Sequence, residues 1–317
     1  MGQDGNWADI PAGHDTALNY AVMSRDRSVM DMVQRAVDHN EVMLAYQPVV
    51  PARSPDSPAF YEGLIRVLDE TGRTIPARDF IEVVEATETG RRIDCLALEH
   101  GLDTLMRQPD LRLSLNMSAR SIGYPRWMRI LNGRLDDQPT LGERLILEIT
   151  ESSAMLVPEL VIGFMRDLQC RGVSFALDDF GAGFTSFRYL RDFYFDIVKI
   201  DGQFIRGIAD SADNQVLTSA LSAIATQFDM LTVAESVRNG AGCRIPGRAR
   251  DQLPAGLLFR GADSKSTLAG RRAGTCRRLT CDIRAVAAMR RVRYDSRDRR
   301  GNPRSCLDAF SGAPPTE

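Results

Sequence analysis

The chain has 317 residues, of which 44% are hydrophobic and 26% charged, with a formal net charge of −2. This is the composition of an ordinary globular protein, and the length allows one large domain or two average ones. No apolar run is long enough to cross a bilayer, and the first residues lack the pattern of a secretory signal. The three histidines and six cysteines, which include no CxxC pair, disfavour a zinc site and predict free thiols in a cytoplasmic protein.

The charge is unevenly distributed along the chain. Residues 1–238 carry about 23 basic and 35 acidic side chains, whereas residues 239–317 carry about 17 and 7. Four of the six cysteines also lie in the second segment. Such a shift marks a boundary. We therefore expect a flexible lead-in over 1–27, a folded domain over 28–238 and an anomalous Arg- and Cys-rich tail over 239–317.

Strand and helix patterns alternate through the folded domain. The first predicted helix has apolar residues at helical spacing from Val29 to Ala36. The elements expected after it are strands 43–50 and 59–66, helices 76–86 and 93–106, strands 111–116 and 144–150, helix 158–170, strands 173–177 and 195–200, helix 214–228 and strand 230–235. This alternation predicts an α/β fold with a largely parallel sheet. Polar residues at the strand ends favour a TIM-like barrel, and no glycine-rich phosphate loop supports a doubly wound sheet.

Two adjacent carboxylates, Asp178 and Asp179, end the apolar run that begins at Val173. Neighbouring residues on a strand point to opposite faces, so both can approach one ion only where the strand ends. The pair is consistent with a turn that caps the next segment or with a site for Mg²⁺ or Mn²⁺. On these two residues alone, the two interpretations are equally supported.

Oxygen-bearing side chains lie at or near the ends of four successive predicted strands, and they are Glu62, Asn116, Glu148 and Asp178. Each one alone is more simply explained as a surface, turn or ion-pair residue. Together they converge on a hard-metal site, beside which Asp179 could hold a second ion. Lys199 ends another strand and is one of only two lysines in an arginine-rich chain. It indicates a need for a compact ammonium, although chance retention is the alternative.

Seven short motifs carry a resemblance to a known family. Tyr61-Glu62-Gly63-Leu64-Ile65-Arg66 is similar to a Glu-Ala-Leu-Leu-Arg signature, with Gly63 in place of alanine. The other motifs, in order, are Ala45–Val50, Leu115–Ser118, Leu147–Glu151, Asp178–Gly183, Val198–Asp201 and Val233–Val237. Over residues 30–237 the chain therefore resembles an EAL domain, the bacterial cyclic di-GMP phosphodiesterase module.

The resemblance implies a TIM-like (β/α)8 barrel that hydrolyses cyclic di-GMP to linear pGpG with two Mg²⁺ or Mn²⁺ ions. The implied metal ligands are Glu62, Asn116, Glu148, Asp178 and Asp179. Lys199 would act on the attacking water, Glu235 would support the metal-and-water end of the site, and Glu151 would anchor the loop after Asp179. The implied substrate contacts are Gln47, Leu64, Arg66 and Ser118. A homodimer is also consistent with the family.

The match breaks after Val237. Arg238 stands where the family has an acidic residue, and Ala255-Gly256-Leu257 stands where a Gln-Gly-aromatic motif opens the last barrel strand. The codons for Ala255 to Leu257 can encode Gln-Gly-Tyr one base later, so we hypothesise a frameshift near codon 238. A gene whose alternate frame encodes no acidic helix and no Gln-Gly-aromatic strand would disprove it. The competing interpretation is a basic tail that binds nucleic acid or membrane, but no amphipathic or aromatic-interleaved pattern supports it, so we expect no DNA or RNA partner.

The last barrel strand and the helix before it are the weakest part of the fold prediction. A barrel without its last strand has two unpaired edges, from which we expect reduced stability and low activity. Residues 257–259 could substitute as a short strand. The alternative function is a regulatory protein that binds cyclic di-GMP without hydrolysing it, which Arg238 and Ala255 favour and the intact metal ligands disfavour. A damaged gene would instead give insoluble protein.

Overall fold

A computed structural model describes residues 16–52, 57–183 and 190–237, and the backbone of 257–260. The strands are β1 (Val42–Pro51), β2 (Phe60–Leu68), β3 (Thr74–Pro76), β4 (Leu113–Asn116), β5 (Leu145–Thr150), β6 (Ser174–Phe180), β7 (Ile197–Ile200), β8 (Leu231–Ala234) and β9 (Leu257–Arg260). The α-helices are α1 (Ala17–Asp38), α2 (Ile81–Val84), α3 (Glu88–Arg107), α4 (Pro125–Asp137), α5 (Glu151–Ala154), α6 (Pro158–Gln169), α8 (Gly202–Ile205) and α9 (Ala212–Gln227). Short 3-10 helices span Ala77–Asp79, Ala119–Ser121 and Pro139–Arg144.

The strands form one sheet that curls into a barrel. Their order is β1-β9-β8-β7-β6-β5-β4-β2-β3, and β1 also pairs with β2. These pairings link every strand except β3 into a ring, and β3 pairs with β2 alone. The predicted α/β, TIM-like fold is confirmed. β9 lies where the substitute strand was expected, while the doubtful helix before it falls within 238–256, outside the described residues.

Two strands, β1 and β3, depart from the predicted, largely parallel arrangement, and β3 runs antiparallel to β2. β1 runs antiparallel to both β2 and β9, whereas the pairings from β2 through β4 to β9 are parallel. A short connection joins β1 directly to β2, and a parallel pair would need a crossover of about a dozen residues or more. The connection therefore fixes the direction of β1.

The helices differ from the predictions at several places. The predicted helix over 76–86 is instead a 3-10 turn, Ala77–Asp79, followed by the one-turn α2, and the short α5 and α8 were not predicted. α1 begins at Ala17 rather than near Val29, and the Thr16 side chain caps it by accepting a hydrogen bond from the Asn19 amide. Leu18 and Met23 in its first turns are exposed, so this half has no buried face that periodicity could reveal. α4 was not predicted, although Trp127, Leu131 and Leu135 are buried at helical spacing and mark its inner face.

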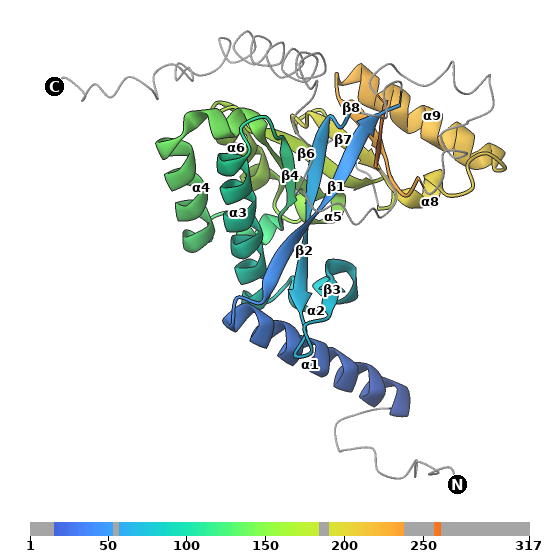
Figure 1. The fold of residues 1–317 in the computed structure, drawn as a ribbon. Coiled ribbons are helices and arrows are strands. Elements are labelled where there is room, and N and C mark those ends of the chain that lie inside the picture. The colour runs from blue at the N-terminus through green and yellow to red at the C-terminus, as the bar shows by residue number, and fades with distance from the viewer. Residues whose placement is uncertain (1–15, 53–56, 184–189, 238–256, 261–317) are drawn as a thin grey trace.

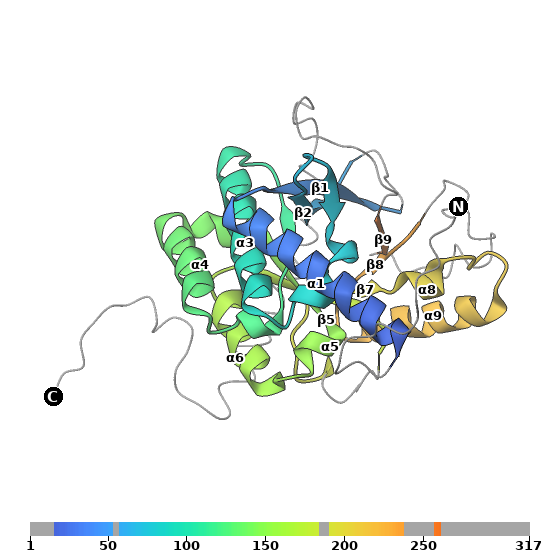
Figure 2. The ribbon, with the colours of Figure 1, turned by 90° about the horizontal axis from the view of Figure 1, so that it is seen from below.

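The helices surround the strands (Figures 1 and 2). α3, α4 and α6 lie on one side of the strands, and α8 and α9 lie on the other. α1 contacts α2, α3 and β2. None of the helices in the described ranges is both long and apolar enough to span a membrane.

The expectation of free thiols holds for one of the two cysteines that the structure describes. Cys95 is a buried free thiol, whereas Cys170 is disulfide-bonded. The sequence pattern gave no indication of that bond, because Cys170 belongs to no CxxC pair.

The barrel interior contains two adjacent layers of side chains that bear on the site. The lower layer is an apolar cluster that includes Val49, Phe60, Ile146, Ala176, Ile197 and Val233. Side chains on a strand return to the same face after two residues. The residues two positions after five of these are Glu62, Glu148, Asp178, Lys199 and Glu235, all of them buried. The two-residue period of the strands thus places one lysine and four carboxylates together, next to this apolar layer.

Gly63, which stands in place of the signature's alanine, is needed for packing outside this interior. A Cβ atom built on Gly63 in β2 would lie 2.8 Å from Leu115 Cδ2, and one on Gly101 in α3 would lie closer still to Leu115 Cδ1. Both contacts are closer than real Cβ atoms approach. The Leu115 side chain therefore fills space that two glycines leave open between the barrel and α3.

We predict that Gly63→Ala, which restores the alanine of the family signature, lowers the free energy of unfolding by about 1–3 kcal/mol through overpacking. Urea denaturation would measure the loss, and Leu115→Val in the same chain should recover part of it. Gly133→Ala is the control, because nothing lies within 4 Å of its Cβ position in α4. Alanine should stabilise that helix by about 0.5–1 kcal/mol. Equal unfolding midpoints for Gly63→Ala and the parent would contradict the prediction.

Candidate metal and substrate site

Four carboxylates surround the Lys199 ammonium at the carboxyl ends of the strands. Lys199 Nζ lies 2.6 Å from Glu148 Oε2 and 3.0 Å from Asp178 Oδ1. It lies 3.1 Å from Glu235 Oε1 and 3.3 Å from Glu62 Oε1. The Lys199 side chain has no exposed surface. One buried cation therefore binds acidic groups in, or directly after, four other strands.

The acidic groups form two overlapping clusters whose oxygens approach within 4.8 Å of one another. Glu62, Glu148 and Asp178 make up one cluster, and Asp178, Asp179 and Glu235 make up the other. Asp178 belongs to both. The amide of Asn116 donates to Glu62 Oε1 at 3.3 Å at the edge of the first cluster. All five predicted metal ligands thus lie at one place.

The backbone after Asp178 turns so that both aspartates reach the site. Asp179 has φ of 56°, in the left-handed region that aspartate tolerates better than most residues. Ser236, which follows Glu235, has the same φ of 56°. The pairing of β6 with β7 is irregular between Leu177 and Phe180. These features remove the strict alternation that would otherwise point Asp179 away from Asp178.

Burial and mutual repulsion dominate the electrostatics of the site. Burial raises the pKa of Asp178 well above its usual value, and the neighbouring carboxylates raise it further against the effect of Lys199. Burial likewise raises the pKa of Glu148 and of Asp179. Burial alone would lower the pKa of Lys199, but the surrounding carboxylates outweigh it and raise that pKa well above the ordinary value. Lys199 therefore stays protonated.

The donor set fits two hard divalent cations. Among the described residues, the five carboxylates of the two clusters, when ionised, exceed the one ammonium between them by four negative charges. Two divalent cations would neutralise that charge. Carboxylate and amide oxygens are the ligands that Mg²⁺ and Mn²⁺ prefer. The two clusters share Asp178, so two ions held by them would be neighbours.

The predicted substrate contacts lie beside this cluster. Leu64 and Arg66 lie on the same face of β2 as Glu62, because they follow it at intervals of two residues. Gln47 is directly opposite Glu62 in the neighbouring strand β1, so it shares that face. Ser118 follows Asn116 at the end of β4. Gln47 is buried, while Leu64, Arg66 and Ser118 are partly exposed, as groups that line an opening would be.

Glu151 connects the end of β5 with the turn after the aspartate pair. It is buried at the start of α5, and its Oε2 accepts a hydrogen bond from the Gly181 amide at 3.3 Å. The continuation of that loop, residues 184–189, lies outside the described residues, as do Arg238 and Ala255.

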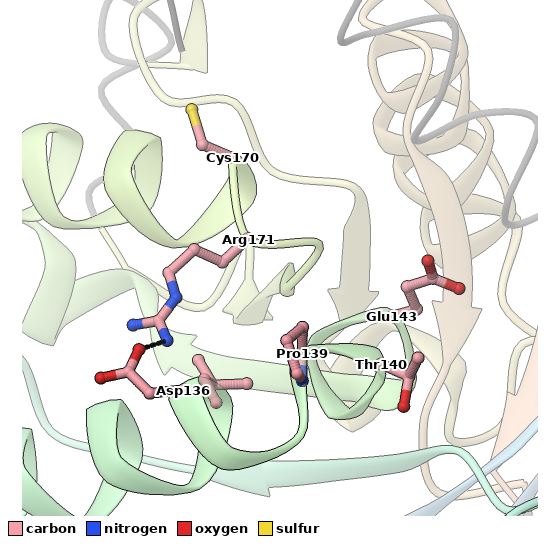
Figure 3. A pocket seen from close by; sticks show the side chains of 7 residues that line it. Asp136, Pro139, Thr140, Glu143, Cys170 and Arg171 are labelled. Atoms are coloured by element: carbon pink, nitrogen blue, oxygen red, sulfur yellow. Dashed lines mark hydrogen bonds and ion pairs between the residues drawn. The ribbon is translucent and has the colours of Figure 1, made fainter. Parts of the chain in front are cut away.

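A cavity of about 380 Å³ occurs elsewhere in the described part of the chain (Figure 3). Leu135, Asp136, Pro139, Thr140, Glu143, Cys170 and Arg171 line it. Arg171 forms an ion pair there with Asp136. Glu143 and Arg171 precede β5 and β6, whereas the acidic cluster lies at the other ends of these strands. The cavity is therefore separate from the candidate site.

Two residues that hold the rim of the site were missed by sequence reasoning. Asp94 in α3 and Ser153 in α5 accept backbone hydrogen bonds from the segment after β4. They are 24 and 34 residues from their partners. No local pattern signals such a contact, so only the fold reveals it.

The fold and the acidic cluster together define a (β/α) barrel protein with an oxygen-rich, lysine-centred site at the carboxyl ends of its strands. Which barrel family this is follows from comparison with known proteins. The pattern of the EAL domain matches residues 30–259, most of the chain. The chain belongs to the EAL domain family.

Named relatives and solved structures agree with this assignment. Cyclic di-GMP phosphodiesterase PdeF of Escherichia coli (strain K12) is 29% identical over 216 residues, which cover 67% of this chain and 28% of that protein. Cyclic di-GMP phosphodiesterase PdeB of Shewanella oneidensis is 29% identical over 211 residues, 65% of this chain and 25% of that protein. The chain thus spans little more than a quarter of the length of these relatives.

Two structures of EAL proteins with cyclic di-GMP share the fold. The PaMucR phosphodiesterase complex has a TM-score of 0.65 at 24% identity, covering 74% of this chain and 94% of that one. The Pseudomonas aeruginosa FimX EAL domain bound to c-di-GMP has a TM-score of 0.63 at 22% identity, covering 74% and 93%. At these identities the likeness supports the barrel fold.

Proposed function

We propose that this chain hydrolyses one phosphodiester bond of cyclic di-GMP, giving linear pGpG, with two Mg²⁺ or Mn²⁺ ions. The observation that carries the proposal is the buried Lys199 ammonium within 3.3 Å of four carboxylates, which together with Asp179 form two metal-sized clusters. The names of the relatives PdeF and PdeB support the choice of substrate.

Each proposed metal ligand lies in one of the two clusters or, for Asn116, at the edge of the first. Glu62, Asn116, Glu148 and Asp178 would hold the first cation, and Asp178 and Asp179 the second. Divalent cations at such a site polarise a phosphate and lower the pKa of a water molecule, which supplies a nucleophile at neutral pH. Because Asp178 belongs to both clusters, the two ions would bind interdependently.

Lys199 and Glu235 are the groups of the chain proposed to act on the reacting atoms. The Lys199 ammonium would orient the attacking water and offset negative charge that builds on the phosphate in the transition state. Glu235 Oε1 lies 3.1 Å from the ammonium and would hold the water end of the site. A pre-placed buried charge is more effective than one that must reorganise during the reaction.

The substrate would lie over the opening of the barrel. Arg66 would bind a phosphate, since a guanidinium can hold two phosphate oxygens at once. Leu64 would contact an apolar face of the nucleotide, and Gln47 and Ser118 would form hydrogen bonds to it. The oxygen of the Ser118 hydroxyl accepts from the Arg120 amide at 3.2 Å, which leaves its hydrogen free to donate.

Incubation of the purified chain with cyclic di-GMP and Mn²⁺ or Mg²⁺ tests the proposal. Linear pGpG that forms only with the metal would support hydrolysis. Binding by calorimetry without product would favour the regulatory alternative, in line with Arg238 and Ala255. Absence of both would overturn the cyclic di-GMP assignment. The homodimer that the family suggests stays a prediction, which light scattering of the same preparation would check.

We predict that Glu151→Ala lowers kcat about 10- to 100-fold, because the turn after Asp179 loses the acceptor of the Gly181 amide. Steady-state kinetics at several Mn²⁺ concentrations would measure the loss, which should shrink as the metal is increased. Glu159→Ala is the control, since that residue is exposed on α6. Unchanged kinetics in Glu151→Ala would show that the turn is held by other contacts.

A further inference from the structure

Four consecutive residues, from the last residue of β4 onward, form hydrogen bonds to four different elements. The Asn116 side chain donates to Glu62 of β2, and the Met117 amide donates to the Glu148 carbonyl of β5 at 2.9 Å. The next two amides turn away from the strands. That of Ser118 donates to Asp94 Oδ2 of α3 at 3.0 Å, and that of Ala119 donates to Ser153 Oγ of α5 at 2.8 Å.

Asp94 makes a second bond to the same segment. The Ser121 hydroxyl donates to Asp94 Oδ2 at 2.6 Å, so one carboxylate oxygen holds both ends of the short turn from Ser118 to Ser121. Among the described residues Asp94 forms no ion pair, and Glu85 is the charged neighbour that acts on it. Burial raises the pKa of Asp94 to about 6. The fold therefore keeps the Asp94 carboxylate where burial disfavours its charge. The groups that it hydrogen-bonds there are the Ser118 amide and the Ser121 hydroxyl.

We propose that Asp94 is a positioning residue for substrate binding, which fixes the turn Ser118–Ser121 so that the Ser118 hydroxyl points toward the opening of the barrel. This inference rests on the proposed function, in which Ser118 contacts the cyclic dinucleotide. Asp94 itself touches none of the five proposed metal ligands in the contacts of the described residues. Its effect should therefore appear in substrate affinity more than in the chemical step.

Stability alone explains the arrangement less well. A carboxylate without an ion pair in a low-dielectric position is costly, and a partly buried apolar side chain could fill the same space. Features that oppose folding in this way concentrate at functional sites. Asp94 also accepts its hydrogen bond from the Ser118 amide, two residues after the proposed metal ligand Asn116. It therefore helps to set the direction in which the chain leaves that ligand.

Asp94→Ala, Asp94→Asn and Ser121→Ala, assayed with cyclic di-GMP and Mn²⁺, would test the role. Asp94→Ala should raise KM about tenfold with kcat changed less than about threefold, because the two hydrogen bonds that hold the turn are lost. Asp94→Asn keeps an acceptor oxygen and should recover most of the affinity, and Ser121→Ala should have a smaller effect of the same kind. Hydrogen exchange of the Ser118 amide should speed up in Asp94→Ala.

Asp196→Ala is the matched control. Asp196 is a buried aspartate that accepts the Phe175 amide at 2.9 Å, but it lies at the opposite ends of the strands. Its loss should lower the melting temperature and leave KM unchanged. A KM of Asp94→Ala equal to the parent value, or no recovery in Asp94→Asn, would overturn the positioning role alone. A parent chain that neither binds nor hydrolyses the dinucleotide would overturn the proposed function and this inference with it.

Discussion

Replacement of Lys199 by methionine should lower the melting temperature of the metal-free protein by about 10 °C. The ammonium is the one cation within 4 Å of Glu62, Glu148, Asp178 and Glu235 in the described ranges. Removing one partner from a buried ionic group typically costs about 3–5 kcal/mol, and each kcal/mol shifts the melting temperature of a domain this size by about 2–4 °C. The methionine fills a similar volume, so the loss is electrostatic rather than one of packing.

Divalent cations should reverse much of this loss. If Mn²⁺ binds the same carboxylates, it supplies the positive charge that the lysine did, and the melting temperatures of the variant and the parent should converge as Mn²⁺ is raised. Turnover should stay about 100- to 1,000-fold below the parent value even with saturating metal. The reason is that the variant lacks the Lys199 ammonium, which would stabilise negative charge in the transition state. Differential scanning calorimetry with chelator and with Mn²⁺ measures the first effect, and product formation measures the second.

Lys265→Met is the control for this experiment. It removes the only other lysine of the chain and thus makes the same change in net charge and composition. It should leave both melting temperature and turnover near the parent values. A metal-free Lys199→Met protein as stable as the parent would mean that the buried carboxylates are already protonated and need no cation.

The strands were predictable because their signals are local. Apolar runs such as Val173 to Leu177 end in polar groups, and the two-residue period carries Glu148 and Lys199 to the same interior as Ile146 and Ile197. The grouping of the acidic residues followed from one further assumption, that parallel strands bring their carboxyl ends to one rim. The structure places all of the predicted metal ligands and Lys199 there.

What the sequence could not predict depends on contacts between distant segments. Asp94 reads as one more polar residue of a helix until the fold places it under the turn after β4. The first half of α1 has no buried face, so its apolar residues gave no periodic signal against a partner. The direction of β1 follows from its connection to β2 rather than from its own residues. These features arise from tertiary structure and leave no local pattern.

Asp178→Asn should have opposite effects on the metal-free protein and on activity. Burial and the adjacent carboxylates raise the pKa of Asp178, so its ionised form destabilises the folded state at neutral pH. The asparagine removes this charge and should raise the metal-free melting temperature at pH 7. In the unfolded chain the Asp178 carboxyl has the ordinary pKa of an aspartate, about 4. Below that value Asp178 is protonated in both states, so the difference between variant and parent should vanish.

The same substitution should abolish the response to metal, because Asp178 is the carboxylate that both acidic clusters share. The shift in melting temperature with Mn²⁺ should be lost, and kcat/KM should fall at least about 1,000-fold, which corresponds to about 4 kcal/mol of transition-state stabilisation. Asp167→Asn on the exposed face of α6 is the control for the change in charge and should behave like the parent. Lys199→Met and Asp178→Asn would then move metal-free stability in opposite directions while both reduce turnover. Two variants that both destabilise the metal-free fold would instead indicate that Asp178 is needed to hold Lys199, and that the cluster is an ion-pair network rather than a site that awaits cations.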